Sequence, residues 1–130
     1  MIVVDASAVV AGLLNAGPAR TALAMEALQA PHLLDGEVAS VLRRLCRTGE
    51  LQVVGAEHLL LVFSALGIRR HASAPLLGRI WALRDNLSAY DASYVALAET
   101  LGCPLLTADR RLAAAPGPTC GITLLAAAPP

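Results

Sequence analysis

The sequence contains no lysine, so all ten of its basic residues are arginines. Without lysine there is no amine to form a Schiff base, to act as a base or to clamp a phosphate, as P-loops and response-regulator receivers require. An aspartyl-phosphate enzyme of the haloacid dehalogenase type needs D-x-D after its first strand. The chain has Asp5-Ala6-Ser7 in that position. These classes of phosphoryl-transfer protein therefore fit poorly.

Cysteine is also scarce. The three cysteines, Cys46, Cys103 and Cys120, are odd in number, widely spaced and never arranged as C-x-x-C. This pattern is neither a disulfide framework nor a zinc motif, and it suits a reducing compartment. We therefore expect the protein to be cytoplasmic.

Hydrophobic runs of membrane-spanning length are missing, although 56% of the residues are hydrophobic. The apolar segment Ala6–Ala16 has no basic residues before it, and Asp5 interrupts it, so we reject a signal peptide. The uncharged segment Leu59–Ile68 is too short to cross a bilayer. We expect no membrane segment. The apolar excess instead predicts a large core and a surface that meets a partner.

Short apolar runs alternate with helical patterns along the 130 residues, which we read as one domain, residues 1–130. Extended segments are expected at Met1–Asp5, Leu51–Val54, Pro104–Leu106 and Ile122–Leu125, with Ile68–His71 as an edge strand or connector. Helices are expected at Ser7–Leu14, from Pro18 to Pro31, from an Asp35 N-cap to Gly49, around Leu59–Leu66, over Pro75–Leu83, and from Tyr90 to Leu101. This alternation predicts an α/β fold with a mostly parallel sheet and right-handed crossovers.

The segment Tyr90–Leu112 carries an acid near each end. Its apolar residues at helical spacing are Tyr94, Leu97, Ala98 and Leu101. Gly102 is expected to end this helix, and the apolar run after it is typical of a buried parallel strand. Asp91 then lies in the first turn of a helix, and Asp109 lies just past the strand that follows.

Asp5, Glu37, Asp91 and Asp109 all fall where a strand ends or a helix begins. Taken singly, each is explained by helix capping and the helix dipole, and Ser88-x-x-Asp91 matches a capping box. Taken together, they meet at the edge of a parallel sheet where ligands bind. Crowded carboxylates repel one another, and a divalent cation offsets that repulsion. Oxygen ligands without His or Cys favour Mg²⁺ or Mn²⁺, and one or two such ions can promote phosphodiester hydrolysis.

Two hydroxyl groups accompany these acids. Ser7 is two residues after Asp5, and Thr107 is two residues before Asp109. Either hydroxyl can orient a carboxylate or a metal-bound water, and either can be an ordinary helix cap. The sequence leaves both explanations open.

At these residues the sequence resembles the PIN domain, and specifically the VapC-type toxins of bacterial toxin–antitoxin pairs. The matching segments are MIVVDASAVV, HLLDGEVASVLRR, NLSAYDASYVALAE and PLLTADRRL, which span nearly the whole chain. The resemblance implies a three-layer α/β/α fold and a metal-dependent endoribonuclease. It also implies that Asp5, Glu37, Asp91 and Asp109 form the acidic site. Such proteins are usually homodimers held inactive by a cognate VapB-type antitoxin.

The arginines agree with an RNA substrate. If four acids belong to a metal site, six remain against ten arginines, and the outer surface is net positive. Arg44, Arg110 and Arg111 are the candidate RNA contacts, whereas Arg69 and Arg70 are weaker ones. The three histidines, His32, His58 and His71, are expected at the surface or in packing. Trp81 is expected in the core or an interface rather than as a base-stacking platform.

Two hypotheses follow. The first is a Mg²⁺- or Mn²⁺-dependent endoribonuclease in which Asp5, Asp91 and Asp109 are the main ligands. Glu37 then binds metal directly or through water, or helps to activate the attacking water. The second is a non-catalytic PIN-like module that binds RNA or a protein partner. Metal binding discriminates between them.

Overall fold

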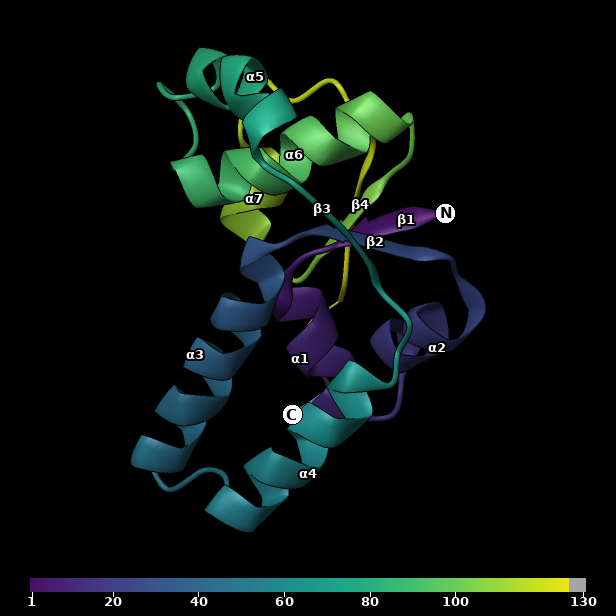
Figure 1. Ribbon diagram of the computed structural model, residues 1–130, viewed down its shortest axis with the longest axis vertical. Helices are drawn as coiled ribbons and strands as arrows, with labels where there is room; N and C mark the ends of the chain where they lie inside the picture. The colour runs from purple at the N-terminus through teal and green to yellow at the C-terminus, as the bar shows by residue number, and fades with distance from the viewer. Residues whose placement is uncertain (127–130) are drawn as a thin grey trace.

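A single parallel sheet organises the protein. The computed structural model describes residues 1–126 and contains five strands in the order β3-β2-β1-β4-β5 (Figure 1). Every neighbouring pair is parallel. The strands are β1 (Ile2–Val4), β2 (Leu28–Pro31), β3 (Arg69–His71), β4 (Leu105–Thr107) and β5 (Ile122–Leu124). The parallel α/β fold is therefore confirmed, and the strands at both ends of the chain lie close to where the sequence predicts them.

Helices cover both faces of this sheet. They are α1 (Ala6–Leu14), α2 (Pro18–Met25), α3 (Leu33–Arg47), α4 (Val53–Ser64), α5 (Leu77–Ala82), α6 (Ala89–Leu101) and α7 (Arg110–Ala114), with a 3₁₀ turn at Ala74–Leu76. Figure 1 shows α1 to α4 on one side of the strands and α5 to α7 on the other. This arrangement confirms the three-layer α/β/α architecture. Within residues 1–126, none of the helices combines the length and apolar character needed to cross a membrane.

The core is built from small and branched side chains. In β1 and β4, Val3, Val4 and Leu105 are fully buried. Helix α6 is buried continuously from Ala92 to Ala98, because it packs against the sheet and against α5. Of the face predicted for this helix, Tyr94, Leu97 and Ala98 are buried, whereas Leu101 is half-buried. Gly102 ends the helix in the left-handed conformation, with φ of 64°, as its position predicts.

One predicted helix is partly wrong. The helix that begins at Pro18 ends at Met25, and Leu28–Pro31 forms strand β2 between β1 and β3. This segment contains no β-branched residue, so its local preference for a strand is weak. Its four residues are nevertheless buried between the two helical layers. The Gln29 Oε1 atom lies 2.7 Å from His71 Nε2, at hydrogen-bonding distance. Tertiary burial therefore decides its conformation.

The boundaries of three other elements also differ from expectation. Helix α3 begins at Leu33, so His32 occupies the N-cap position predicted for Asp35. The Asp35 carboxylate instead accepts hydrogen bonds from Arg70, at 2.8 Å from Nε and 2.7 Å from Nη2. The extended segment expected at Leu51–Val54 is wrong, because α4 begins at Val53. Pro75 lies in the 3₁₀ turn before α5, not in an α-helix.

Gly12 is required where α1 and α2 cross. A Cβ atom at this position would collide with Leu23 Cδ1 and would lie 3.2 Å from the backbone nitrogen of Arg20. We predict that Gly12→Val lowers the free energy of unfolding by about 1–3 kcal/mol, because the two helices must move apart. Urea denaturation measures this change. Gly78→Ala is the matched control: a Cβ at Gly78 meets open space, so the variant should be as stable as wild type or slightly more stable. Equal effects of the two changes would contradict the prediction.

Candidate active site

The parallel pairing of β1 and β4 places two of the acids at the same edge of the sheet. Val4 is paired with Leu106, and Asp5 and Asp109 follow these strands as the N-cap residues of α1 and α7. Glu37 lies near the start of α3, which follows β2, and Asp91 lies in the first turn of α6. All four acids therefore come from segments at, or directly beyond, a strand end or a helix start.

Asp5 is the most constrained of the four. Its side chain is 6% exposed, and its Oδ1 accepts hydrogen bonds from Ser7 Oγ at 2.6 Å and from the Ala8 backbone N–H at 2.9 Å. The Thr107 hydroxyl donates to Oδ2. Three donors thus hold both carboxylate oxygens, and the carboxylate plane cannot rotate without breaking them.

The same hydroxyls connect the two turns that carry Asp5 and Asp109. Ser7 Oγ accepts from the Ala108 N–H at 2.9 Å, and Thr107 Oγ1 accepts from the Asp109 N–H at 3.0 Å. The two hydroxyl oxygens lie 3.3 Å apart. Both hydroxyls therefore contact Asp5 while they bind backbone groups, so the two explanations from the sequence coexist in one network.

Glu37 has a partner that sequence reasoning missed. Its Oε1 accepts a hydrogen bond of 2.5 Å from the hydroxyl of Tyr94, a side chain that is only 1% exposed. The sequence pattern identifies Tyr94 merely as core. The signal that was available is chemical, because a buried tyrosine hydroxyl needs an acceptor.

Helix capping explains some of these acids and not others. Asp5 accepts from the Ala8 N–H, and Asp109 accepts from the Arg111 N–H at 2.9 Å, so both are true N-caps. The N-cap of α6 is Ser88, whose hydroxyl accepts from the Asp91 N–H at 3.1 Å. Within residues 1–126, the Asp91 and Glu37 carboxylates make no capping hydrogen bond. Helix capping therefore does not explain why acids occur at positions 37 and 91.

The acids are electrostatically coupled. Burial raises the pKa of Asp5, Glu37 and Asp91, and neighbouring carboxylates raise them further. The negative charge of Asp91 acts on both Asp5 and Glu37, and Asp109 acts on Asp91, where the Arg111 guanidinium partly opposes it. In Asp5, the hydrogen bonds from Ser7, Thr107 and Ala8 lower the pKa but do not cancel the effect of burial. The cluster therefore holds negative charge at a free-energy cost.

The donor set fits a hard cation by its chemistry. All four side chains offer oxygen, the ligand that Mg²⁺ and Mn²⁺ prefer, and a cation would offset their repulsion. In the described part of the chain, however, no three His, Cys, Asp or Glu side chains are gathered as a ready-made metal site. Asp91 borders a cavity of about 270 Å³ that Asn86, Ser88 and Arg111 also line. The Asp91 carboxylate thus borders the same cavity as the Arg111 guanidinium.

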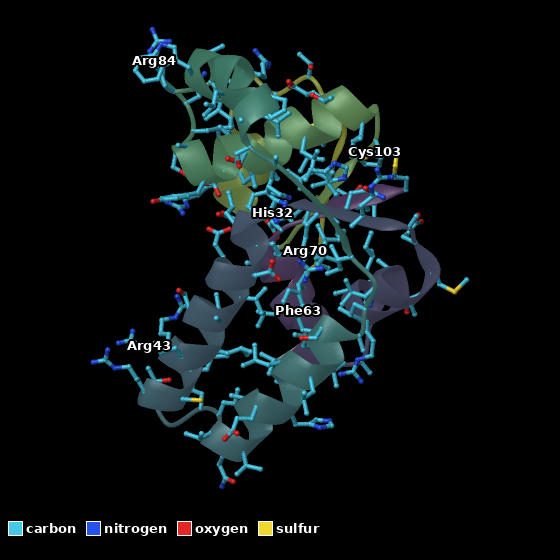
Figure 2. All side chains as sticks on the ribbon, viewed as in Figure 1. His32, Arg43, Phe63, Arg70, Arg84 and Cys103 are labelled. Carbon is cyan, nitrogen blue, oxygen red and sulfur yellow. The ribbon has the colours of Figure 1, made fainter. Side chains whose placement is uncertain are left out.

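The candidate RNA contacts are all solvent-exposed arginines. Arg44 lies on the exposed face of α3, and Arg110 and Arg111 begin α7 directly after Asp109. Arg70 differs, because its guanidinium donates hydrogen bonds to the Asp35 carboxylate and lies 5.5 Å from the centre of the Phe63 ring. Figure 2 places Arg43 and Arg84 at the same side of the molecule, on different helical layers.

Trp81 is 68% exposed, so the core position considered for it is wrong and an interface remains. The Arg84 guanidinium lies 4.8 Å from the centre of its ring. His32 and His58 are exposed, and His71 packs on Gln29.

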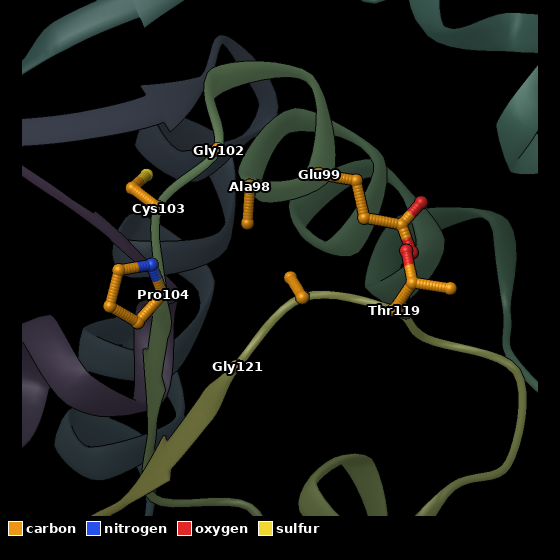
Figure 3. Close-up of a pocket in the computed structure, with 8 residues that line it drawn as sticks. Ala98, Glu99, Gly102, Cys103, Pro104, Thr119 and Gly121 are labelled. Carbon is orange, nitrogen blue, oxygen red and sulfur yellow. The ribbon is translucent and has the colours of Figure 1, made fainter.

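A second cavity lies at the opposite edge of the sheet (Figure 3). Its volume is about 360 Å³, and Cys103, Pro104, Cys120 and Gly121, which precede β4 and β5, line it together with Glu99. Burial raises the pKa of both thiols, so neither is activated as a nucleophile. Glu99 is engaged by Arg79 at 2.6 Å and by the Thr119 N–H at 2.7 Å. This cavity therefore offers no competing catalytic centre.

The fold is that of a known family. The sequence profile of the PIN domain matches residues 2–118, and the chain belongs to this family. It is 50% identical over 125 residues to VapC ribonuclease Mb0985 of Mycobacterium bovis, which covers 96% of this chain and 98% of the relative.

Two solved structures are similar. PAE2754 from Pyrobaculum aerophilum is 28% identical and superposes with a TM-score of 0.74 over 93% of this chain and 81% of that one. VapC20 of Mycobacterium tuberculosis, described as a toxin that cleaves the sarcin–ricin loop, is 22% identical with a TM-score of 0.65. It covers 88% of this chain and 94% of its own, and at this identity the likeness shows the fold alone.

The raised pKa of Asp91 gives a prediction for the metal-free protein. A carboxyl whose folded-state pKa exceeds its unfolded value contributes stability below the unfolded pKa and loses it as pH rises through the folded pKa. We predict that Asp91→Asn is more stable than wild type at pH 7 by roughly 1 kcal/mol. The difference should disappear below the unfolded pKa. Urea unfolding in EDTA across a pH series measures it.

Glu99→Gln is the control of opposite sign. Although burial opposes it, the Arg79 and Thr119 hydrogen bonds lower the pKa of Glu99 overall. The Glu99 carboxylate therefore contributes to folding stability above its unfolded-state pKa, and this contribution is lost as pH falls through its folded-state pKa. Glu99→Gln should therefore destabilise the protein at pH 7 and not at low pH. If both variants changed stability in the same direction, the electrostatic account of the acidic cluster would be wrong.

Proposed function

We propose that the protein is a Mg²⁺- or Mn²⁺-dependent endoribonuclease and the toxin of a toxin–antitoxin pair. The observation that carries this proposal is the coupled group of four acids at the carboxyl edge of a PIN domain. The near full-length similarity to a VapC ribonuclease supports RNA as the substrate.

In this proposal Asp5, Asp91 and Asp109 hold the cation, and Glu37 holds it directly or through water or helps to activate the attacking water. The bound cation supplies a more acidic water and charge stabilisation for the leaving oxygen of the phosphodiester. Side chains of the protein orient the ligands and contact the substrate. Ser7 and Thr107 keep the Asp5 carboxylate in one orientation, and Arg111, whose side chain is 91% exposed, is available to a phosphate. No covalent intermediate with the protein is needed.

The partners in this proposal are RNA, a cognate VapB-type antitoxin and a second copy of the chain in a homodimer. Exposed apolar side chains support a protein partner. Val53, Val54 and Leu61 are exposed on α4, and Leu77 and Trp81 are exposed on α5. These two groups lie on opposite sides of the sheet (Figure 1), and each offers apolar surface that a partner could cover.

The alternative is a PIN-like module that binds RNA or protein without cleaving it. One observation favours it: the described carboxylates do not form a ready-made metal site. Calorimetric titration with Mn²⁺ decides between the two. Absence of Mn²⁺ binding would favour the binding module.

We predict that the purified protein cuts RNA only when Mg²⁺ or Mn²⁺ is present, and that Asp91→Asn reduces the rate at least about 100-fold. The reason is that Asp91 is the acid to which the other carboxylates are coupled. Cleavage of a labelled single-stranded RNA, with and without EDTA, measures this. Glu57→Gln on the exposed face of α4 removes an acid outside the cluster and should cut at the wild-type rate. Cleavage by Asp91→Asn at the wild-type rate would show that the proposed site is wrong.

Arg44 gives a prediction about substrate binding. It lies on α3 seven residues beyond Glu37, two turns and about 10 Å along the axis, and points to solvent. In an Asp91→Asn background, which keeps the RNA intact, Arg44→Ala should weaken RNA binding and reduce the slope of log K against log salt by about 0.7 to 1.

Arg69→Ala in the same background is the matched control. Arg69, the weaker candidate for RNA contact, is exposed on the edge strand β3, and its removal should change the salt slope less than Arg44→Ala does. An unchanged slope for Arg44→Ala would exclude Arg44 from phosphate contact.

A further inference from the structure

Tyr94 is a buried polar group to which the proposed reaction assigns no role. The chain has only two tyrosines, and Tyr94 is the buried one, at 1% exposure, in the middle of α6. Burying a phenol hydroxyl without a partner is costly, and a phenylalanine would fill the same volume without that cost. The hydroxyl therefore needs a reason beyond packing.

The reason lies in what the hydroxyl contacts. Tyr94 belongs to α6 on one face of the sheet, whereas Glu37 belongs to α3 on the other face (Figure 1). Their 2.5 Å hydrogen bond joins residues 57 positions apart and so bridges the two helical layers at the acidic edge. No other donor contacts the Glu37 carboxylate within the described residues, which leaves Oε2 unengaged.

Glu37 needs such a restraint more than the other acids do. Asp5 is held by three donors, and Asp109 is held by the N–H of its own helix turn. Glutamate has one more rotatable bond than aspartate, and Glu37 is repelled by the charges of Asp5 and Asp91. Without a donor its favoured response is to rotate toward solvent, away from the cluster.

We infer that Tyr94 is a positioning residue, which engages Oε1 of Glu37 and thereby presents Oε2 to the cation site. This inference rests on the proposed function and adds a further side chain to it. A neutral donor suits the task, because it restrains the carboxylate without neutralising its charge. Oε2, which accepts no hydrogen bond within the described residues, would then be the oxygen available to a cation or to a water.

The first test uses Tyr94→Phe, which keeps the ring and removes one oxygen. Loss of a hydrogen bond that orients a metal ligand typically weakens metal binding by about 10- to 100-fold. We expect the Mn²⁺ dissociation constant, measured by calorimetry, to rise by that factor. The kcat for RNA cleavage should fall while KM for RNA stays within about twofold, because the hydroxyl does not touch RNA.

Ser93→Ala is the matched control. Ser93 is also buried in α6, but its hydroxyl donates at 2.7 Å to the backbone carbonyl of Ala89 and not to an acid. Its removal should leave the Mn²⁺ dissociation constant unchanged. A Tyr94→Phe protein that binds Mn²⁺ within about twofold of wild type would overturn the inference, since purely structural hydroxyls would behave alike in both variants.

The second test does not depend on metal. Crystal structures of metal-free wild type and Tyr94→Phe should show Glu37 ordered in the first and rotated out of the cluster in the second. Urea unfolding gives a further comparison. Introduced into wild type, Tyr94→Phe should lower the unfolding midpoint. Introduced into Glu37→Ala, where the hydroxyl has already lost its acceptor, it should not. If wild type bound no Mn²⁺, the proposed function would fail, and the calorimetric test would not apply. The crystal structures would still test the inference, which would be overturned if Glu37 kept its position without the Tyr94 hydroxyl.

Discussion

Mutual repulsion among carboxylates at one edge of the sheet is the constraint on which the site depends. A parallel sheet brings the residues after β1 and β4 to the same edge, and helix starts add Glu37 and Asp91. Left alone, these charges would push their segments apart. The buried donors around them act in the opposite sense: Ser7 and Thr107 hold Asp5, and Tyr94 holds Glu37. The architecture of the edge is therefore a balance between charge repulsion and hydrogen bonds from uncharged groups.

The four acids differ in how many hydrogen-bond donors hold them. Asp5 accepts hydrogen bonds from three donors, and Glu37 accepts one, from Tyr94. Asp109 accepts one from the Arg111 N–H and also pairs with the Arg111 guanidinium at 3.7 Å. The Asp91 carboxylate accepts no side-chain hydrogen bond within the described residues. Asp91 is also the acid that borders a cavity and faces Arg111. The site thus contains one carboxylate held by several donors and one that borders a cavity without such restraint. This difference in restraint suits a centre that must keep its shape and still admit a large substrate.

The sequence predicts those parts of the site that depend on local position. The positions of Asp5, Asp91 and Asp109 are predicted correctly, because strand ends and first turns leave a clear local pattern. Strand β2 is missed because Leu28–Pro31 carries no β-branched residue, so only its burial between β1 and β3 makes it a strand. The pairing of Asp35 with Arg70 and of Tyr94 with Glu37 joins residues far apart in the chain. A single sequence holds no local signal for such pairs, although the need of a buried tyrosine for an acceptor gives a hint.

Asp5 and Asp109 have a second duty as helix N-caps, and this separates them from Glu37 and Asp91. A cap stabilises its helix whether or not the protein has any activity. In a descendant of this chain released from selection for its activity, folding alone would still favour an acid, Asn, Ser or Thr at positions 5 and 109. At position 37, loss of the acid would relieve repulsion but leave the buried Tyr94 hydroxyl without its acceptor, so folding still favours Glu or Gln there. At position 91 the carboxylate accepts no side-chain hydrogen bond within the described residues, and removing its charge relieves repulsion. Decay of the site is therefore expected to begin at the aspartate of α6 and to leave the two capping acids among its last traces.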